Sequence, residues 1–268
     1  MQIIKENNKC YNDYEITSFE TDAYYDARLN YYFGLVQEVA GKHAATKGVS
    51  IMALQEQGLT WVISRTRMNI EHYGKWLDKI NVITWAQKCQ LFHCPRKIVA
   101  TDEQGNPVFT AKTMWAIINK ENGRPVRPQQ YIEDMIGLPP EEEREDEKLP
   151  KMPLFEDVVK EGIITYKPSI LYLDTDYNHH VNNISYINWI NEALPTTFRD
   201  KYKMSFIDCR YLMQTYRNDE LIVSFGSEDG RPFESDEPKL YFKIERFKGD
   251  EKERVFEAYT EWKERSEF

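Results

Sequence analysis

Two segments of the chain carry hydrophobic residues at every third or fourth position, the spacing of one face of an α-helix. The first segment spans residues 32–41, with Phe33, Val36 and Ala40, and the second spans residues 186–194, with Ile187, Ile190 and Leu194. Each pattern predicts a helix whose apolar stripe needs a covering surface. Pro195 predicts the end of the second helix, because proline cannot continue it.

After each predicted helix, hydrophobic and polar residues alternate, as they do in half-buried β-strands. The alternating segments are 59–70, 79–89, 96–103 and 108–118 in the first half, and 204–213, 220–228, 239–247 and 255–262 in the second. Gln104–Asn106 has the composition of a hairpin turn. The sequence therefore predicts an α+β fold in which a curled antiparallel sheet wraps one helix, twice over.

The two halves match each other in several places. Tyr32 on the first helix aligns with Tyr186 on the second, and Asp78 aligns with Asp219 at the start of equivalent strands. Matches in the same order indicate an internal duplication rather than chance similarity.

A charged, Pro-flanked stretch separates the halves. Residues 141–148 hold six acidic and two basic residues, so this stretch is too polar to fold by itself. We therefore expect an N-terminal domain at 1–137, a charged linker at 138–154 and a C-terminal domain at 155–268.

Composition narrows the class of protein. With 41% hydrophobic residues the chain can build a sizeable core. The net charge is −9, from 35 basic and 44 acidic residues, which argues against nucleic-acid binding. No apolar run approaches the roughly 20 residues of a membrane span, and the first residues show no signal or transit pattern. We expect a cytoplasmic protein that binds neither a membrane nor nucleic acid.

The four cysteines, Cys10, Cys89, Cys94 and Cys209, lack the spacing of a metal site. We expect free thiols that are mostly buried, with no disulfide framework, no metal and no cofactor.

The densest polar cluster, residues 174–183, directly precedes the second predicted helix. In an extended loop, the side chains of Asp176, Asn178 and His180 would point the same way. His180 can move protons near neutral pH, Asp176 can orient it or activate a water, and Asn178 can bind a carbonyl. Asn182 or Asn183 would cap the helix, whose N-terminal amides could hold an oxyanion. The alternative is that these residues only make turns and caps.

The motif DxNxHVNNxxYxxW at 176–189 resembles the hallmark of the acyl-acyl-carrier-protein (acyl-ACP) thioesterases, plant and bacterial enzymes with two hot-dog domains. Segments 58–88 and 113–129 are also similar to this family, and the resemblance covers roughly residues 10–130 and 160–225. It implies two tandem hot-dog domains and hydrolysis of fatty acyl-ACP to free fatty acid. It also implies that Asp176, Asn178 and His180 are catalytic, and that the first domain shapes the acyl pocket.

One further family position falls where the sequence departs from the pattern. Gln214 stands where the family commonly has Glu, and Thr215 stands where plant members often have Cys. Gln214 can orient a water but cannot accept its proton. We therefore expect Gln214 to assist an attacking water activated by Asp176, by His180 or by both.

The acyl chain and its carrier need their own contacts. Phe33, Val36 and Trp61 are candidates for the acyl pocket, although an ordinary core role fits them as well. The expected partner is an acyl carrier protein, which is acidic, so docking needs a local basic patch. Candidate cations for this patch are Lys201, Lys203, Arg210 and Arg217.

Several alternatives stay open. The same chemistry would serve an acyl-coenzyme A thioesterase, and Gln214 leaves room for a non-catalytic acyl-binding module. A hot-dog dehydratase is disfavoured, because no glycine follows His179 or His180 closely. Both a monomer and a homodimer are compatible with two halves that can pair within one chain.

Overall fold

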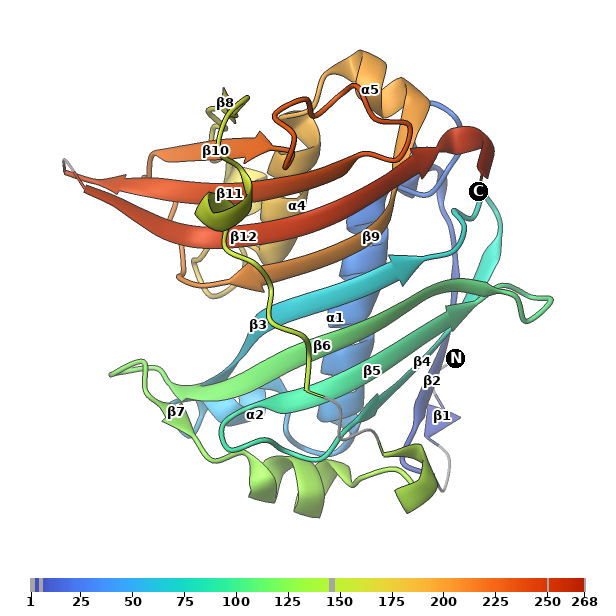
Figure 1. The fold of residues 1–268 in the computed structure, drawn as a ribbon. Helices are drawn as coiled ribbons and strands as arrows, with labels where there is room; N and C mark the ends of the chain where they lie inside the picture. The colour runs from blue at the N-terminus through green and yellow to red at the C-terminus, as the bar shows by residue number, and fades with distance from the viewer. Residues whose placement is uncertain (1–2, 5–6, 145–147, 250, 268) are drawn as a thin grey trace. The chain divides into compact units, whose positions relative to one another are not determined.

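The chain divides into two units, Met1–Leu149 and Pro150–Phe268. The computed structural model describes residues 3–4, 7–144, 148–249 and 251–267. Each unit places its main helix against an antiparallel sheet, as Figure 1 shows. Residues 145–147 of the predicted linker lie outside the described residues.

The first unit is built on a sheet with the strand order β1-β2-β4-β5-β6-β3, and β7 pairs with β6. All these pairings are antiparallel. The strands are β1 (Ile3–Ile4), β2 (Cys10–Glu15), β3 (Leu59–Ile70), β4 (Lys79–Ala86), β5 (Cys94–Thr101), β6 (Pro107–Asn119) and β7 (Pro125–Val126). Its helical elements are η1 (Ser18–Glu20), α1 (Leu29–Thr46), α2 (Ile51–Gln55), η2 (Gln130–Ile136) and η3 (Glu141–Glu143).

Helix α1 supplies the core of the first unit. Phe33 and Val36 are buried on it, together with Tyr32 and Val39. The helix is longer than the predicted 32–41 at both ends, and its buried face runs from Leu29 to Ala44. His43 lies on the same buried face and is fully inaccessible.

The second unit is built on a sheet with the strand order β9-β12-β11-β10-β8. The strands are β8 (Ile164–Tyr166), β9 (Tyr202–Tyr211), β10 (Leu221–Gly226), β11 (Lys239–Lys248) and β12 (Glu251–Glu264). Its helical elements are α3 (Phe155–Val158), η4 (Tyr172–Asp174), α4 (Asn183–Glu192), α5 (Thr196–Lys201) and η5 (Arg265–Glu267). Helix α4 buries Tyr186, Ile187, Trp189 and Ile190.

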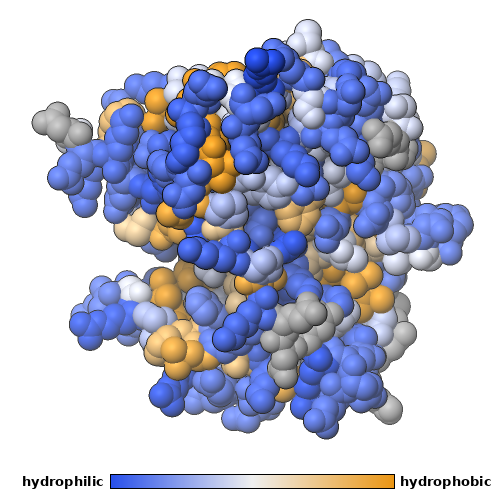
Figure 2. Space-filling view, in the orientation of Figure 1, coloured by the Kyte–Doolittle hydropathy of each residue, from blue (hydrophilic) through white to orange (hydrophobic). Residues whose placement is uncertain are grey.

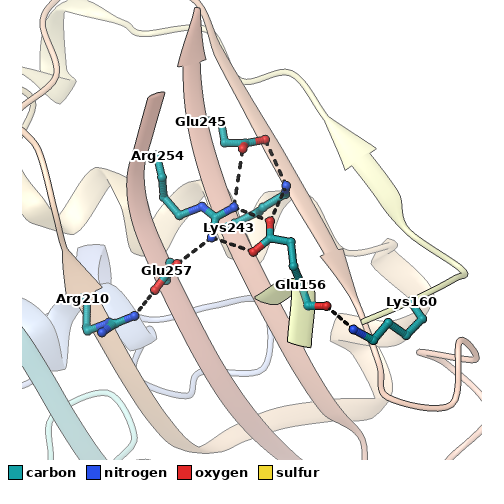
Figure 3. A network of polar contacts seen from close by, with 7 residues as sticks. All are labelled: Glu156, Lys160, Arg210, Lys243, Glu245, Arg254 and Glu257. Atoms are coloured by element: carbon teal, nitrogen blue, oxygen red, sulfur yellow. Dashed lines mark hydrogen bonds and ion pairs between the residues drawn. The ribbon is translucent and has the colours of Figure 1, made fainter. Parts of the chain in front are cut away.

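A charged network crosses the sheet of the second unit and reaches α3 (Figure 3). Glu257 of β12 is 3% exposed and pairs with Arg210 of β9 and with Arg254 of its own strand. Glu156 of α3 accepts hydrogen bonds from Arg254 at 3.0 Å and from Lys243 at 2.9 Å. These ion pairs link the short helix α3 to the strands β11 and β12.

The predicted alternation of helix and sheet is therefore found within each unit. β3 has the bounds that the alternating pattern predicts, and the hairpin turn at Gln104–Asn106 is closed by the Asp102 carboxylate. Hydrophilic residues cover most of the face in Figure 2, where hydrophobic residues form patches. None of the helices in the described residues is long and apolar enough to cross a membrane.

Candidate functional site

Residues 175–182, just before α4, form a tight hydrogen-bonded turn. Thr175 and Val181 pair as an antiparallel bridge, and the Asp176 amide donates to the His180 carbonyl at 2.9 Å. The His179 amide donates back to the Asp176 carbonyl at 3.0 Å. His179 has φ +62°, in the left-handed region that closes such a turn. The loop is therefore a closed turn.

The expectation of an extended loop is thus wrong. The reversal at His179 breaks the strict alternation, so spacing alone does not aim Asp176, Asn178 and His180. The Asp176 carboxylate is also occupied, because its Oδ1 accepts the Asn178 amide at 2.8 Å. All three side chains are partly exposed, whereas Tyr177 and His179 are exposed. The turn keeps the three residues within one short segment.

Asn182 is the N-cap of α4, as the sequence predicts. Its side-chain oxygen accepts the Ile184 amide at 2.9 Å, and its carbonyl accepts the Ser185 amide at 3.0 Å. These two amides are therefore taken by the cap and are not available to a substrate carbonyl. The positive end of the helix dipole remains beside the turn.

Gln214 lies in a loop rather than on a strand. The pairing of β9 with β12 ends where Tyr211 meets Phe256, so residues 212–219 leave the sheet. The loop is pinned at both ends by Arg246, which donates to the Gln214 carbonyl at 2.8 Å and to Asp219 Oδ2 at 3.2 Å. Gln214 therefore lies just beyond β9 and beyond the alternating segment 204–213.

Thr215 connects this loop to the turn before α4. Its carbonyl accepts the Val181 amide at 2.9 Å, and its hydroxyl lies 2.6 Å from the Tyr186 hydroxyl. Thr215 is fully buried, so its side chain serves packing and cannot present a nucleophile to a substrate. Cys209 is also fully buried, on β9.

Tyr216 joins Gln214 to His180. Its ring meets the His180 ring edge-on, with centroids 5.1 Å apart and planes at 88°. Its hydroxyl donates to Gln214 Oε1 at 3.4 Å. Sequence reasoning missed Tyr216, because its contact with His180 forms only when the loop after β9 meets the turn before α4. The structure thus brings all four predicted catalytic residues, Asp176, Asn178, His180 and Gln214, into one neighbourhood.

The first unit contains the same turn. Thr21 and Ala27 form the bridge, and the Asp22 amide donates to the Asp26 carbonyl at 2.8 Å. Asp22 Oδ1 accepts the Tyr24 amide at 2.9 Å, as Asp176 does for Asn178, and Tyr25 has φ +64°. The Ala27 amide donates to the Gly74 carbonyl at 2.8 Å. The duplication therefore extends to individual hydrogen bonds.

The candidate acyl-pocket residues do not form one group. Phe33 and Val36 are buried on α1. Trp61 packs instead against a cluster formed by the end of α1, α2 and η2, and its indole donates to the Val49 carbonyl at 2.9 Å. Phe33 and Val36 are not members of that cluster.

The candidate docking cations differ in their surroundings. Lys203 is buried, and Arg210 is neutralised by the buried Glu257, so neither offers a free charge to a partner. Lys201 pairs with Glu264 at 3.0 Å. Arg217 stacks over the ring of Tyr172, 5.9 Å from its centroid, and is exposed. Arg217 is thus the candidate that the structure leaves at the surface near the turn.

The cysteines are free in the structure, and three of them are buried. Within the residues that the structure describes, no group of three or more His, Cys, Asp or Glu side chains is placed to hold a metal ion.

Comparisons with known proteins match both units. The model of the acyl-ACP thioesterase N-terminal domain matches residues 7–136, and that of the C-terminal domain matches residues 160–264. An oleoyl-acyl carrier protein thioesterase of Arabidopsis thaliana is 27% identical over 76% of this chain. A palmitoyl-acyl carrier protein thioesterase of Cuphea hookeriana is 26% identical over 78% of it. The chain spans 59% and 52% of the lengths of these two relatives.

Solved structures share the fold. An acyl-ACP thioesterase from Bacteroides thetaiotaomicron aligns with a TM-score of 0.80 and 22% identity, over 96% of this chain and 99% of that one. The 12:0-ACP thioesterase from Umbellularia californica aligns with a TM-score of 0.75 and 18% identity, over 97% and 99%. The fold prediction of two tandem hot-dog domains is confirmed.

Proposed function

The chain belongs to the acyl-ACP thioesterase family, and from this premise we propose that it hydrolyses the thioester of a fatty acyl-ACP. The products are a free fatty acid and the carrier's thiol. The observation that carries the proposal is the turn before α4, which holds Asn178 and His180 beside a helix N-terminus in a chain whose two units both match the family.

In this reaction His180 acts as the general base. It takes a proton from a water as the water oxygen attacks the thioester carbonyl carbon. The tetrahedral intermediate then breaks its carbon–sulfur bond, and the proton returns to the thiolate. A thiolate leaves readily because its pKa is far below that of an alkoxide, so no strong acid is needed.

Asn178 holds the carbonyl oxygen as negative charge develops on it. Its side-chain amide is a donor, and its backbone is fixed by the Asp176 carboxylate at 2.8 Å. The dipole of α4 adds a positive partial charge beside the turn. Asp176 therefore contributes mainly as the anchor of the turn, because one of its oxygens is already committed to the Asn178 amide.

The acyl chain is proposed to bind in the apolar interior of the first unit, along the α1 face that contains Phe33 and Val36. Each buried methylene contributes about 0.8 kcal/mol, so the depth of such a site would select chain length. The partner is proposed to be an acyl carrier protein, and Arg217 is a candidate contact for its acidic surface.

The test is turnover of acyl-ACP thioesters from short to long chains, with the matching acyl-coenzyme A thioesters alongside. We expect hydrolysis of acyl-ACP with the higher kcat/KM, and its loss in His180→Ala. A preference for coenzyme A would replace the carrier part of the proposal. Binding of acyl-ACP without turnover would instead favour a non-catalytic acyl-binding module.

A further inference from the structure

Tyr216 is an aromatic side chain in an exposed loop, yet its backbone is firmly held. Its amide donates to Asp219 Oδ2 at 2.9 Å, and the Asp219 amide donates to the Tyr216 carbonyl at 3.0 Å. Arg246 fixes both Gln214 and Asp219. The side chain is nevertheless 46% exposed. The backbone that carries this exposed ring is therefore fixed by hydrogen bonds within the loop.

The ring of Tyr216 contacts His180. The two rings make an edge-on contact at 5.1 Å, a geometry that favours aromatic pairs. The residues next to the two rings are also tied together, because the Val181 amide donates to the Thr215 carbonyl at 2.9 Å. The imidazole and the phenol ring are therefore mounted on two segments that cannot separate without breaking this backbone bond.

The first unit shows that this pair of positions recurs. Lys75 is the counterpart of Tyr216, because its amide donates to Asp78 Oδ2 at 2.6 Å as that of Tyr216 does to Asp219. Its side chain forms an ion pair with Asp26, the counterpart of His180. In each unit, one loop carbonyl accepts an amide from the turn, that of Gly74 in the first unit and that of Thr215 in the second. The residue after this carbonyl, Lys75 or Tyr216, contacts the side chain of the last residue of the turn.

We propose that Tyr216 is the positioning residue of His180, and that Gln214 influences the site through the Tyr216 hydroxyl. The inference rests on the proposed thioester hydrolysis. The ring restricts the rotation of the imidazole, so that its nitrogen stays aimed at the attacking water. Gln214 accepts the Tyr216 hydroxyl at 3.4 Å and limits the movement of the ring. In this way Gln214 contributes to the reaction although it cannot accept a proton.

The experiment compares Tyr216→Leu, which removes the ring, with Tyr216→Phe, which keeps it. The matched control is Tyr25→Leu, an exposed aromatic residue on the corresponding turn of the first unit. Steady-state hydrolysis of acyl-ACP by the full chain is measured for each. We expect Tyr216→Leu to lower kcat about tenfold with KM within about twofold, Tyr216→Phe to recover most of that loss, and Tyr25→Leu to match wild type.

A mutant cycle separates positioning from general structural damage. In a His180→Ala chain, Tyr216→Leu should cause no further loss in single-turnover rate, because the ring has no imidazole to hold. In the wild-type chain Gln214→Ala should lower kcat about twofold, and in a Tyr216→Phe chain it should have no effect. An equal loss with and without His180, or a change in KM alone, overturns the inference.

The outcomes keep the two proposals apart. Lack of turnover by the wild-type chain overturns the proposed function and, with it, the role of Tyr216. Wild-type turnover combined with full activity of Tyr216→Leu overturns the positioning role only. If Tyr216→Leu fails to fold, the Gln214→Ala pair still decides, because Gln214 is an exposed side chain whose loop contacts are otherwise made by its backbone.

Discussion

The turn at Asp22–Asp26 and the turn at Asp176–His180 share a backbone but carry different side chains. Both have the same bridge, the same left-handed residue and the same carboxylate accepting an amide two residues on. Only the second turn has Asn and His at the third and fifth positions, where the first has Tyr24 and Asp26. The shared backbone hydrogen bonds are those that the turn needs in order to form. The side chains at the third and fifth positions differ, and these are the positions that can carry out chemistry.

The similarity of the two turns indicates a structural role for Asp176, the first residue of the second turn. Asp176 matches the general description of a catalytic carboxylate, but Asp22 makes the same hydrogen bond in a turn without Asn or His. The Asp26 carboxylate, the counterpart of His180, is neutralised by Lys75. One catalytic centre per chain, in the second unit, is therefore the arrangement we propose.

The largest expected effect is the difference in kcat between substitutions at the fifth position of each turn, His180 in the second unit and Asp26 in the first. His180→Ala should lower kcat by about 1,000-fold, the scale of losing a general base. Asp26→Ala should change kcat by less than about threefold, although it leaves Lys75 without its ion pair. Steady-state kinetics of the two variants on one acyl-ACP substrate checks this. Comparable losses in both would show that the copies are functionally equivalent.

The next effect tests whether Asp176 acts through its hydrogen bond to the Asn178 amide or through its negative charge. Asparagine keeps the oxygen that accepts the Asn178 amide and removes the charge, whereas alanine removes both. Asp176→Ala should lower kcat about 100-fold, because a displaced catalytic group costs that much. Asp176→Asn should keep activity within about tenfold of wild type.

Asp22→Ala and Asp22→Asn are the matched controls for this prediction. Asp22→Ala should cost about 1 kcal/mol of unfolding free energy, comparable to a lost cap, without changing kcat more than about threefold. Loss of activity in Asp176→Asn equal to that in Asp176→Ala would restore a chemical role to the charge.

Much of this arrangement could be predicted from the sequence. The helical stripes of Phe33 and Ile187, the β3 bounds and the Asn182 cap follow from local periodicity and capping chemistry, which act over a few residues. The closed turn does not follow from the alternating spacing, because that spacing assumes an extended backbone and the left-handed residue His179 reverses the chain.

Other features depended on pairing between distant segments. The position of Gln214 off the sheet is set by where β9 stops pairing with β12, at Tyr211 and Phe256. These residues are 45 positions apart, so local patterns do not encode this end. The contact of Tyr216 with His180 depends on the same loop. Isolated His43 gave no signal either, because its burial against Arg96 appears only when α1 meets β5.

The units should also differ in acid sensitivity. Burial, together with nearby Arg96, lowers the pKa of His43 in the first unit to about 3. The unfolded chain takes up this proton near pH 6.5 and the folded chain refuses it. Stability is therefore unaffected above pH 6.5 and falls as the pH drops toward 3, by about 2 kcal/mol at pH 5.

His43→Gln tests this linkage, because Gln offers an oxygen to Arg96 and does not titrate. The free energy of unfolding is measured with denaturant at pH 7 and at pH 5. Its decrease between these two pH values should be about 2 kcal/mol smaller in the variant than in the wild-type chain. His93→Gln, which replaces an exposed histidine of the same unit, is the control and should keep the wild-type difference. An identical loss in His43→Gln would show that this histidine accepts a proton in the folded state.

The smallest effect concerns the charged network of the second unit. Hydrogen bonds from Arg254, then Lys243, lower the pKa of Glu156 to about 2. Because the folded pKa is depressed, its contribution is present above pH 4.5 and is lost as the pH falls toward 2. The Glu156 side chain is 52% exposed, so solvent screens these ion pairs.

Glu156→Gln should therefore cost only about 0.5 kcal/mol at pH 7, and less below pH 4. The control is Glu103→Gln in the first unit. Glu103 pairs with Lys79 and both side chains are more than half exposed, so this change should have almost no effect. Denaturant unfolding of both variants at pH 7 measures the difference. A cost well above 1 kcal/mol for Glu156→Gln would mean that α3 is held to its sheet mainly by charge, whereas a small cost assigns that role to the buried Phe155 ring.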